Sequence, residues 1–123
     1  MAGHGSSRRP EQVAESIRTT LAEALLRGEV RDPRVTMVTV SGVEVTRDLG
    51  HATIRVAPHG TAEEKDAAIV GLQSAAGYLR RMVAKTLTTR TVPELHFVLD
   101  RGLEHARRID ELLAGLKRDG EAS

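Results

Sequence analysis

The strongest constraint on this fold is an amphipathic helical pattern that is too long for a small domain. Thr61 and Glu64 form a capping box at its start, and apolar residues then recur at helical spacing as far as Leu87. An unbroken helix over residues 62–88 would be about 40 Å long at 1.5 Å per residue, whereas a domain of this size has a radius of gyration of about 13 Å. The pattern therefore predicts a helix that bends.

The weakest part of this helix is the run Ala75, Ala76 and Gly77. Glycine in a helix interior costs about 1 kcal/mol relative to alanine, and it accepts backbone angles that other residues resist. We expect the change of direction within a residue or two of Gly77. Gly71 is the competing position for the break.

Apolar periodicity predicts the other elements of the chain. Pro10 suits the first position of a helix, and Gly28 suits its end. In the first strand the apolar residues change phase on either side of Gly42, which predicts a bulge or bend at that residue. The predicted elements are helices over about residues 10–27 and 103–117, and strands over about residues 35–46, 51–56 and 94–99.

Together these elements predict an α+β fold in one domain. The order is helix, two strands, a bent helix counted as two helices, a third strand and a C-terminal helix, with a three-stranded sheet covered by helices on one face. That order is the arrangement of a type II KH-like domain. We expect a flexible basic arm over residues 1–9, the domain over residues 10–117 and a polar tail over residues 118–123.

Five segments of the chain carry a resemblance that goes beyond the order of elements. They are VEVTRDL (43–49), SAAGYLR (74–80), VPELHF (92–97), EHA (104–106) and RIDELL (108–113). In these segments the chain resembles the ribosome-binding factor A family, and the resemblance extends over about residues 8–116. Ordinary KH domains clamp a nucleic-acid backbone with a Gly-x-x-Gly loop between the two central helices. This family has an Ala-x-Gly kink there instead, and Ala75, Ala76 and Gly77 occupy that place.

The resemblance implies a function that composition does not show. A member of this family binds the free, immature 30S ribosomal subunit and its 16S rRNA during late maturation, including processing of the 5' end of the RNA, often with a role in cold adaptation. It catalyses no reaction and needs no cofactor. We therefore expect a cytoplasmic monomer that binds neither a membrane nor a small-molecule substrate.

Basic residues are concentrated in the second half of the bent helix and the segment after it. Arg80, Arg81, Lys85 and Arg90 lie in a stretch without an acidic residue, whereas Glu63, Glu64 and Asp66 lie in the first half. Arg81 and Lys85 are four residues apart and share a helix face, and the kink leaves a helix N-terminus that attracts anions. We predict that these four residues contact RNA phosphates. A solvated helix face without any partner is the simpler alternative.

Two further basic groups have competing explanations. Arg8 and Arg9 lie in the predicted arm, where they could contact phosphate or only increase solubility. Arg101, Arg107 and Arg108 alternate with acidic residues. For this second group we favour surface ion pairs, which stabilise a protein only slightly.

Composition excludes several classes of function. The chain has no Cys, which rules out disulfides and thiol chemistry, and its only aromatic residues are Tyr78 and Phe97, which leaves little for a base-stacking surface. The formal net charge is only +1, so RNA binding must depend on local clusters of charge. No apolar run approaches the roughly 18 residues that a transmembrane helix needs.

An enzyme and a protein-interaction module are the rival interpretations. Asp48, His51, Glu94 and His96 offer acids and bases, but Asp48 suits a turn and the other three occupy strand positions that point away from the core. The five histidines, at positions 4, 51, 59, 96 and 105, show no ligand spacing, and we expect no metal. A KH-like interaction module without RNA affinity would instead expose an apolar patch.

Overall fold

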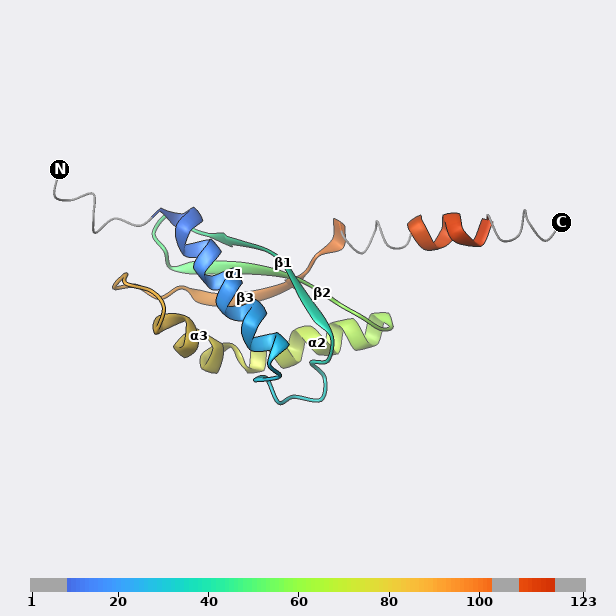
Figure 1. The fold of residues 1–123 in the computed structure, drawn as a ribbon, viewed down its shortest axis with the longest axis horizontal. Coiled ribbons are helices and arrows are strands. Elements are labelled where there is room, and N and C mark those ends of the chain that lie inside the picture. The colour runs from blue at the N-terminus through green and yellow to red at the C-terminus, as the bar shows by residue number, and fades with distance from the viewer. Residues whose placement is uncertain (1–8, 103–108, 117–123) are drawn as a thin grey trace.

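The computed structural model describes residues 9–102 and 109–116. Its elements follow the predicted order (Figure 1). They are α1 (Pro10–Leu26), β1 (Val38–Val45), β2 (His51–Pro58), α2 (Ala62–Ser74), α3 (Ala76–Ala84) and β3 (Glu94–Leu99). Residues 109–116 are helical, as predicted, while residues 1–8, 103–108 and 117–123 lie outside the described part. None of the described helices has the length and hydropathy of a membrane span.

The three strands form one mixed sheet in the order β1-β2-β3. β1 and β2 pair antiparallel through the tight turn at residues 46–50, and β2 and β3 pair parallel. The predicted bulge is present, because the register shifts between Val40 and Gly42. A Cβ at residue 42 would overlap the end of the flexible Arg55 side chain, so glycine lets the Arg55 guanidinium lie close over the bulge.

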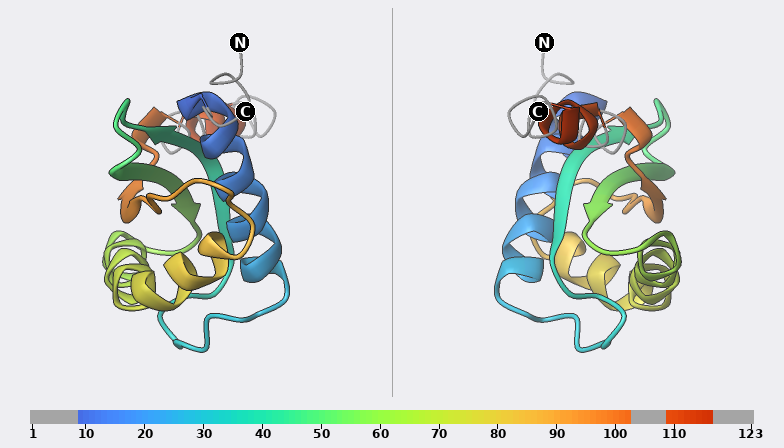
Figure 2. Two further views of the ribbon diagram at one scale, coloured as in Figure 1. Left: turned by 90° about the vertical axis from the view of Figure 1, so that its left-hand side faces the viewer. Right: turned by 90° about the vertical axis from the view of Figure 1, so that its right-hand side faces the viewer.

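All three labelled helices lie on one side of the sheet, and the core lies between (Figure 2). α1 buries one apolar stripe, whose members include Val13, Ile17 and Leu21. Gly28 ends this helix with a φ of 70°, a conformation that favours glycine, and the N–H of Glu29 donates to the Ala24 carbonyl at 3.0 Å. The sheet contributes Ala52, Ile54, Val56, Leu95 and Phe97 to the core.

The long helix is broken as predicted. α2 ends at Ser74, Ala75 has φ −88° and ψ 0°, and α3 begins at Ala76. The Thr61–Glu64 capping box is formed in both directions at the start of α2.

Gly71 lies inside α2 and is not the break, so its role differs from the alternative that the sequence suggested. A Cβ on Gly71 would lie 2.8 Å from Cγ2 of Val35. Residues 32–35 therefore pack directly on α2 at this point, which explains why the first strand begins at Val38 and not near residue 35. Glycine at position 71 is needed for helix–loop packing.

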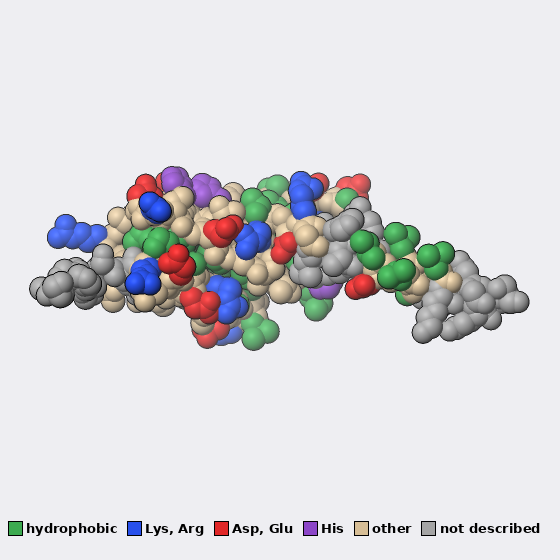
Figure 3. Space-filling view, turned by 90° about the horizontal axis from the view of Figure 1, so that it is seen from above, with side chains coloured by type: hydrophobic (Ala, Val, Ile, Leu, Met, Phe, Trp, Pro, Cys, Tyr) green, Lys and Arg blue, Asp and Glu red, His purple; other side chains and the backbone are tan. Residues whose placement is uncertain are grey.

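The helical segment 109–116 leaves apolar side chains exposed. Figure 3 shows hydrophobic side chains along this segment, which is red in Figure 1. The exposed residues are Ile109, Leu112, Leu113 and Leu116, of which Leu116 has 67% of its surface accessible.

Candidate nucleic-acid interface

α3 is amphipathic, and its polar face carries the predicted basic residues. Leu79 and Val83 are buried in the core, which turns Arg80, Arg81 and Ala84 toward solvent. The helix ends at Ala84, and Lys85 follows as its C-terminal cap residue. The positive charge of a lysine interacts favourably with the negative C-terminal end of a helix. Lys85 therefore has a structural role besides any contact with RNA.

A shallow groove runs between α3 and the segment that leads into β3. It has a volume of about 310 Å³. Its lining residues are Gly77, Arg80, Arg81, Ala84, Arg90 and Val92. The structure thus brings together three of the four basic residues predicted for this region, whereas Lys85 is exposed but not part of the lining. We call this feature the basic groove.

Arg80 has a structural role in the basic groove that the sequence did not reveal. Its Nε donates to the carbonyl oxygens of Val92 and Pro93 at 3.2 Å each, and its Nη2 donates to the Val92 carbonyl at 2.6 Å. These bonds tie α3 to the segment before β3. They also fix the position of the guanidinium. Carbonyl groups carry no net charge, so they do not offset its positive charge.

Within the described part of the chain, the basic residues of the groove and Lys85 have no acidic partner. No ion pair is found for Arg80, Arg81, Lys85 or Arg90 within residues 9–102 and 109–116. Between Asp66 and Glu94 the sequence contains no acidic residue. Phosphate would therefore not have to displace any carboxylate of the described residues.

Other arginines show the contrasting arrangement. Arg18 pairs with Glu15, Arg27 with Glu29, Arg34 with Asp32 and Arg55 with Glu44. The carboxylates respond: hydrogen bonds from Arg34 hold the pKa of Asp32 down at about 2, and Arg18 likewise lowers the pKa of Glu15.

The kink between α2 and α3 affects the shape of the groove, and it adds little attraction for anions. The negative end of α2 and the positive end of α3 meet at Ala75, whose N–H donates to the carbonyls of Gly71 and Leu72. The opposite partial charges of the two helix ends offset each other. We therefore assign anion affinity to the side chains of the groove and not to the N-terminus of α3. Gly77 has no left-handed φ, and a Cβ there would meet only Arg81 Nη1, at 3.8 Å.

The other predicted basic residues lie elsewhere. Arg9 is exposed directly before α1 and does not line the groove, and Arg8 lies outside the described residues. Arg101 is exposed, but Arg107 and Arg108 are not described, so their predicted ion pairs remain predictions.

Sequence reasoning missed a second cavity on the other side of the kink. Its volume is about 580 Å³, and it is lined by residues 27–32 together with Gly71, Ser74, Ala75 and Tyr78. The Tyr78 hydroxyl donates to Glu29 at 3.1 Å, and Glu29 also pairs with Arg27. The cavity carries charges of both signs, so it is a weaker candidate for phosphate than the basic groove.

Sequence reasoning also missed a cluster on the open face of the sheet. His51, Glu94 and His96 are exposed, as predicted, but the two histidines lie in contact although they are 45 residues apart. The histidines show no ligand spacing along the chain, and that observation gave no sign of this contact. The parallel pairing of β2 and β3 brings the two residues together.

Known proteins similar to this chain share one description. A family model described as ribosome-binding factor A matches residues 9–113. A ribosome-binding factor A from Thermomicrobium roseum is 45% identical over 113 residues, which cover 92% of this chain and 87% of that protein.

Solved structures agree with the sequence comparison. The solution structure of a Thermotoga maritima protein described as a ribosome binding factor A has a TM-score of 0.64 at 34% identity, covering 72% of this chain and 83% of that one. A homology model of the Thermus thermophilus ribosome binding factor A, fitted into an electron cryomicroscopy map of its 30S complex, has a TM-score of 0.53 at 25% identity. That match covers 70% of this chain and 93% of the other.

Proposed function

The chain belongs to the ribosome-binding factor A family, and from this premise we propose that it binds the free 30S subunit through its 16S rRNA. In this role it assists late maturation of the subunit, including processing of the 5' end of the RNA. The Thermus relative in the comparison was fitted as part of a 30S complex, which supports the choice of partner.

The basic groove is the observation that carries the RNA contact. Arg81 and Arg90 are exposed on its walls and pair with no carboxylate of the described residues, and Lys85 continues the positive surface beyond the end of α3. Such a surface neutralises phosphates and releases counterions, which supplies most of the affinity of a sequence-independent contact. Arg80 holds the two walls together through its bonds to backbone carbonyls.

The proposed mechanism requires shape and charge but no chemistry. The groove offers cations and no general base or nucleophile, so RNA processing would be performed by separate nucleases once the subunit is bound. We accordingly infer that the protein is not an enzyme, that it works without a cofactor and that it acts in the cytoplasm.

Directed hydroxyl-radical probing tests where RNA lies. Because the chain has no native Cys, Ala84→Cys places a single iron–EDTA tether in the basic groove, and Glu63→Cys places a matched tether on the exposed acidic end of α2. With bound 30S subunits we expect strong cleavage of 16S rRNA from position 84 and little from position 63. Equal cleavage from both positions, or none from position 84, would contradict the proposed interface.

A protein-interaction module is the second candidate, and the helix at residues 109–116 favours it. Leu112, Leu113 and Leu116 are exposed on this segment, a feature typical of a surface that contacts another protein. This candidate predicts 30S binding that survives high salt and is lost when the three leucines are replaced by serine.

A further inference from the structure

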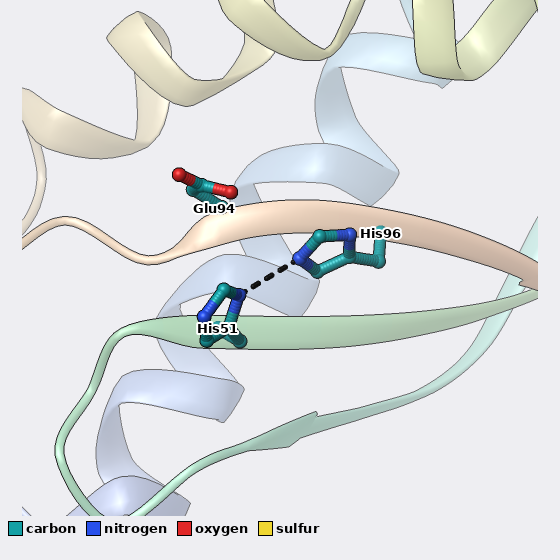
Figure 4. A group of neighbouring side chains, drawn as sticks. All are labelled: His51, Glu94 and His96. Atoms are coloured by element: carbon teal, nitrogen blue, oxygen red, sulfur yellow. Dashed lines mark hydrogen bonds between the residues drawn. The ribbon is translucent and has the colours of Figure 1, made fainter.

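The mixed sheet brings three metal-ligating residues together on its open face. In the parallel pairing, His51 of β2 lies opposite Glu94 of β3, and Thr53 lies opposite His96. Residues two apart in a strand point to the same side, so His51, Glu94 and His96 share one face. The other face carries Ala52, Leu95 and Phe97, which are buried. Figure 4 shows the two histidines in front of β2 and β3, with α1 behind the strands, and the Glu94 side chain beside β3.

Their ligating atoms lie close enough to share one ion. Nδ1 of His51 and Nε2 of His96 are 2.9 Å apart. One ring nitrogen from each histidine and a carboxylate oxygen of Glu94 all lie within 4.8 Å of one another. Two metal–nitrogen bonds of about 2.05 Å hold the nitrogens about 2.9 Å apart at a right angle and about 3.35 Å apart at a tetrahedral angle. In the structure the two nitrogens share a hydrogen bond at 2.9 Å, and a metal ion would replace its proton. A small rotation of the exposed rings gives the tetrahedral separation.

We propose that His51, His96 and Glu94 bind a divalent transition-metal ion, with Zn²⁺ as the preferred ion. Two neutral imidazoles and one carboxylate are a ligand set that suits Zn²⁺, and water completes the coordination at this exposed position. Glu94 brings a flexible side chain that can close the remaining distance, since it is exposed at the first residue of β3.

The surrounding charges favour a cation at this position. Asp48 lies in the adjacent turn, where hydrogen bonds from the Thr46 hydroxyl and the Gly50 N–H lower the pKa of its carboxyl. Asp48 is thus a fixed negative charge beside the site. On the same face of β2, the Arg55 guanidinium is paired with Glu44.

This site is separate from the proposed RNA interface. The basic groove lies on α3, on the helix-covered side of the sheet, whereas the histidines lie on the open side. Metal binding can therefore be tested independently of binding to 30S subunits.

Calorimetric titration with ZnCl₂ at neutral pH tests the proposal on the full chain. We expect one saturable equivalent of Zn²⁺, with affinity reduced at least tenfold by His51→Ala or His96→Ala and less strongly by Glu94→Gln. The control is His59→Ala, an exposed histidine outside the cluster, which should change affinity less than twofold. Circular dichroism verifies that each variant is folded.

Stability and NMR give readouts that do not depend on calorimetry. Zn²⁺ at about 100 times its dissociation constant should raise the ratio of folded to unfolded protein about 100-fold, because the ion binds only the paired strands. It should also shift the imidazole signals of His51 and His96 before those of His59. The proposal is wrong if the wild type takes up no Zn²⁺, if the His51→Ala/His96→Ala double variant binds it as tightly, or if His59→Ala loses as much affinity.

Discussion

Replacing three cations of the basic groove should weaken 30S binding by an amount that can be calculated. The variant is Arg81→Gln/Lys85→Gln/Arg90→Gln, and Arg80 is kept because it fixes the groove wall. Each phosphate contact contributes about 0.7–0.9 to the slope of log affinity against log salt, so three contacts contribute about 2–2.7. When the salt concentration rises fourfold, these three contacts alone should lower the affinity of the wild type roughly 20- to 40-fold. The variant should lack this part of the salt dependence.

The control for this prediction is a second triple variant with the same change of net charge. Arg18→Gln/Arg34→Gln/Arg55→Gln also lowers the formal charge from +1 to −2, but each of these arginines is already paired with a carboxylate. We expect its salt slope to change by less than about 1 unit. The assay is filter binding of labelled protein to purified 30S subunits between 50 and 200 mM salt, as an approximate range over which such contacts respond. Equal slopes for the wild type and the groove variant would refute the assignment.

Three further predictions concern stability and use urea unfolding as the assay. Arg80→Gln should lose about 1–2 kcal/mol, because hydrogen bonds to two backbone carbonyls are removed; an unchanged midpoint would contradict this role. Gly71→Ala should lose about 1–2 kcal/mol, because contact with Val35 outweighs the gain in helix propensity. Arg34 lowers the pKa of Asp32 from its ordinary 3.8 to about 2, so the stability it contributes is present above about pH 4 and is lost as the pH falls toward 2. Asp32→Asn should remove this loss of stability between about pH 4 and pH 2. An unaltered dependence of stability on pH would argue against the ion pair.

Local patterns predicted the fold because the physics that fixes it is largely local. The change of apolar phase around Gly42 can be reconciled with one buried face by a bulge or bend, and the structure has a register shift there. The length of the apolar pattern demanded a break near Gly77, and the break occurs at Ala75. The role of Gly71 could not be predicted, because it depends on a loop that packs on α2 from 36 residues earlier in the chain, at Val35.

For the candidate sites, the sequence predicted only those residues that stand out as a run of like charge. A stretch without acidic residues located Arg81 and Arg90, whose proximity to RNA is still a proposal. The bonds from Arg80 to the segment before β3 depend on how that segment folds back on α3, which no periodicity encodes. Likewise, His51 and His96 meet only through parallel strand pairing, so spacing along the chain gave no signal for them.

The central claim is that this protein binds the small ribosomal subunit through electrostatic contacts with its RNA. Co-sedimentation of the unmodified protein with purified free 30S subunits and, in parallel, with 50S subunits tests it most directly. The protein should sediment with 30S subunits at low salt and leave them as the salt concentration rises, with little association with 50S subunits throughout. Absence from the 30S fraction at low salt, or association that does not respond to salt, would contradict the account.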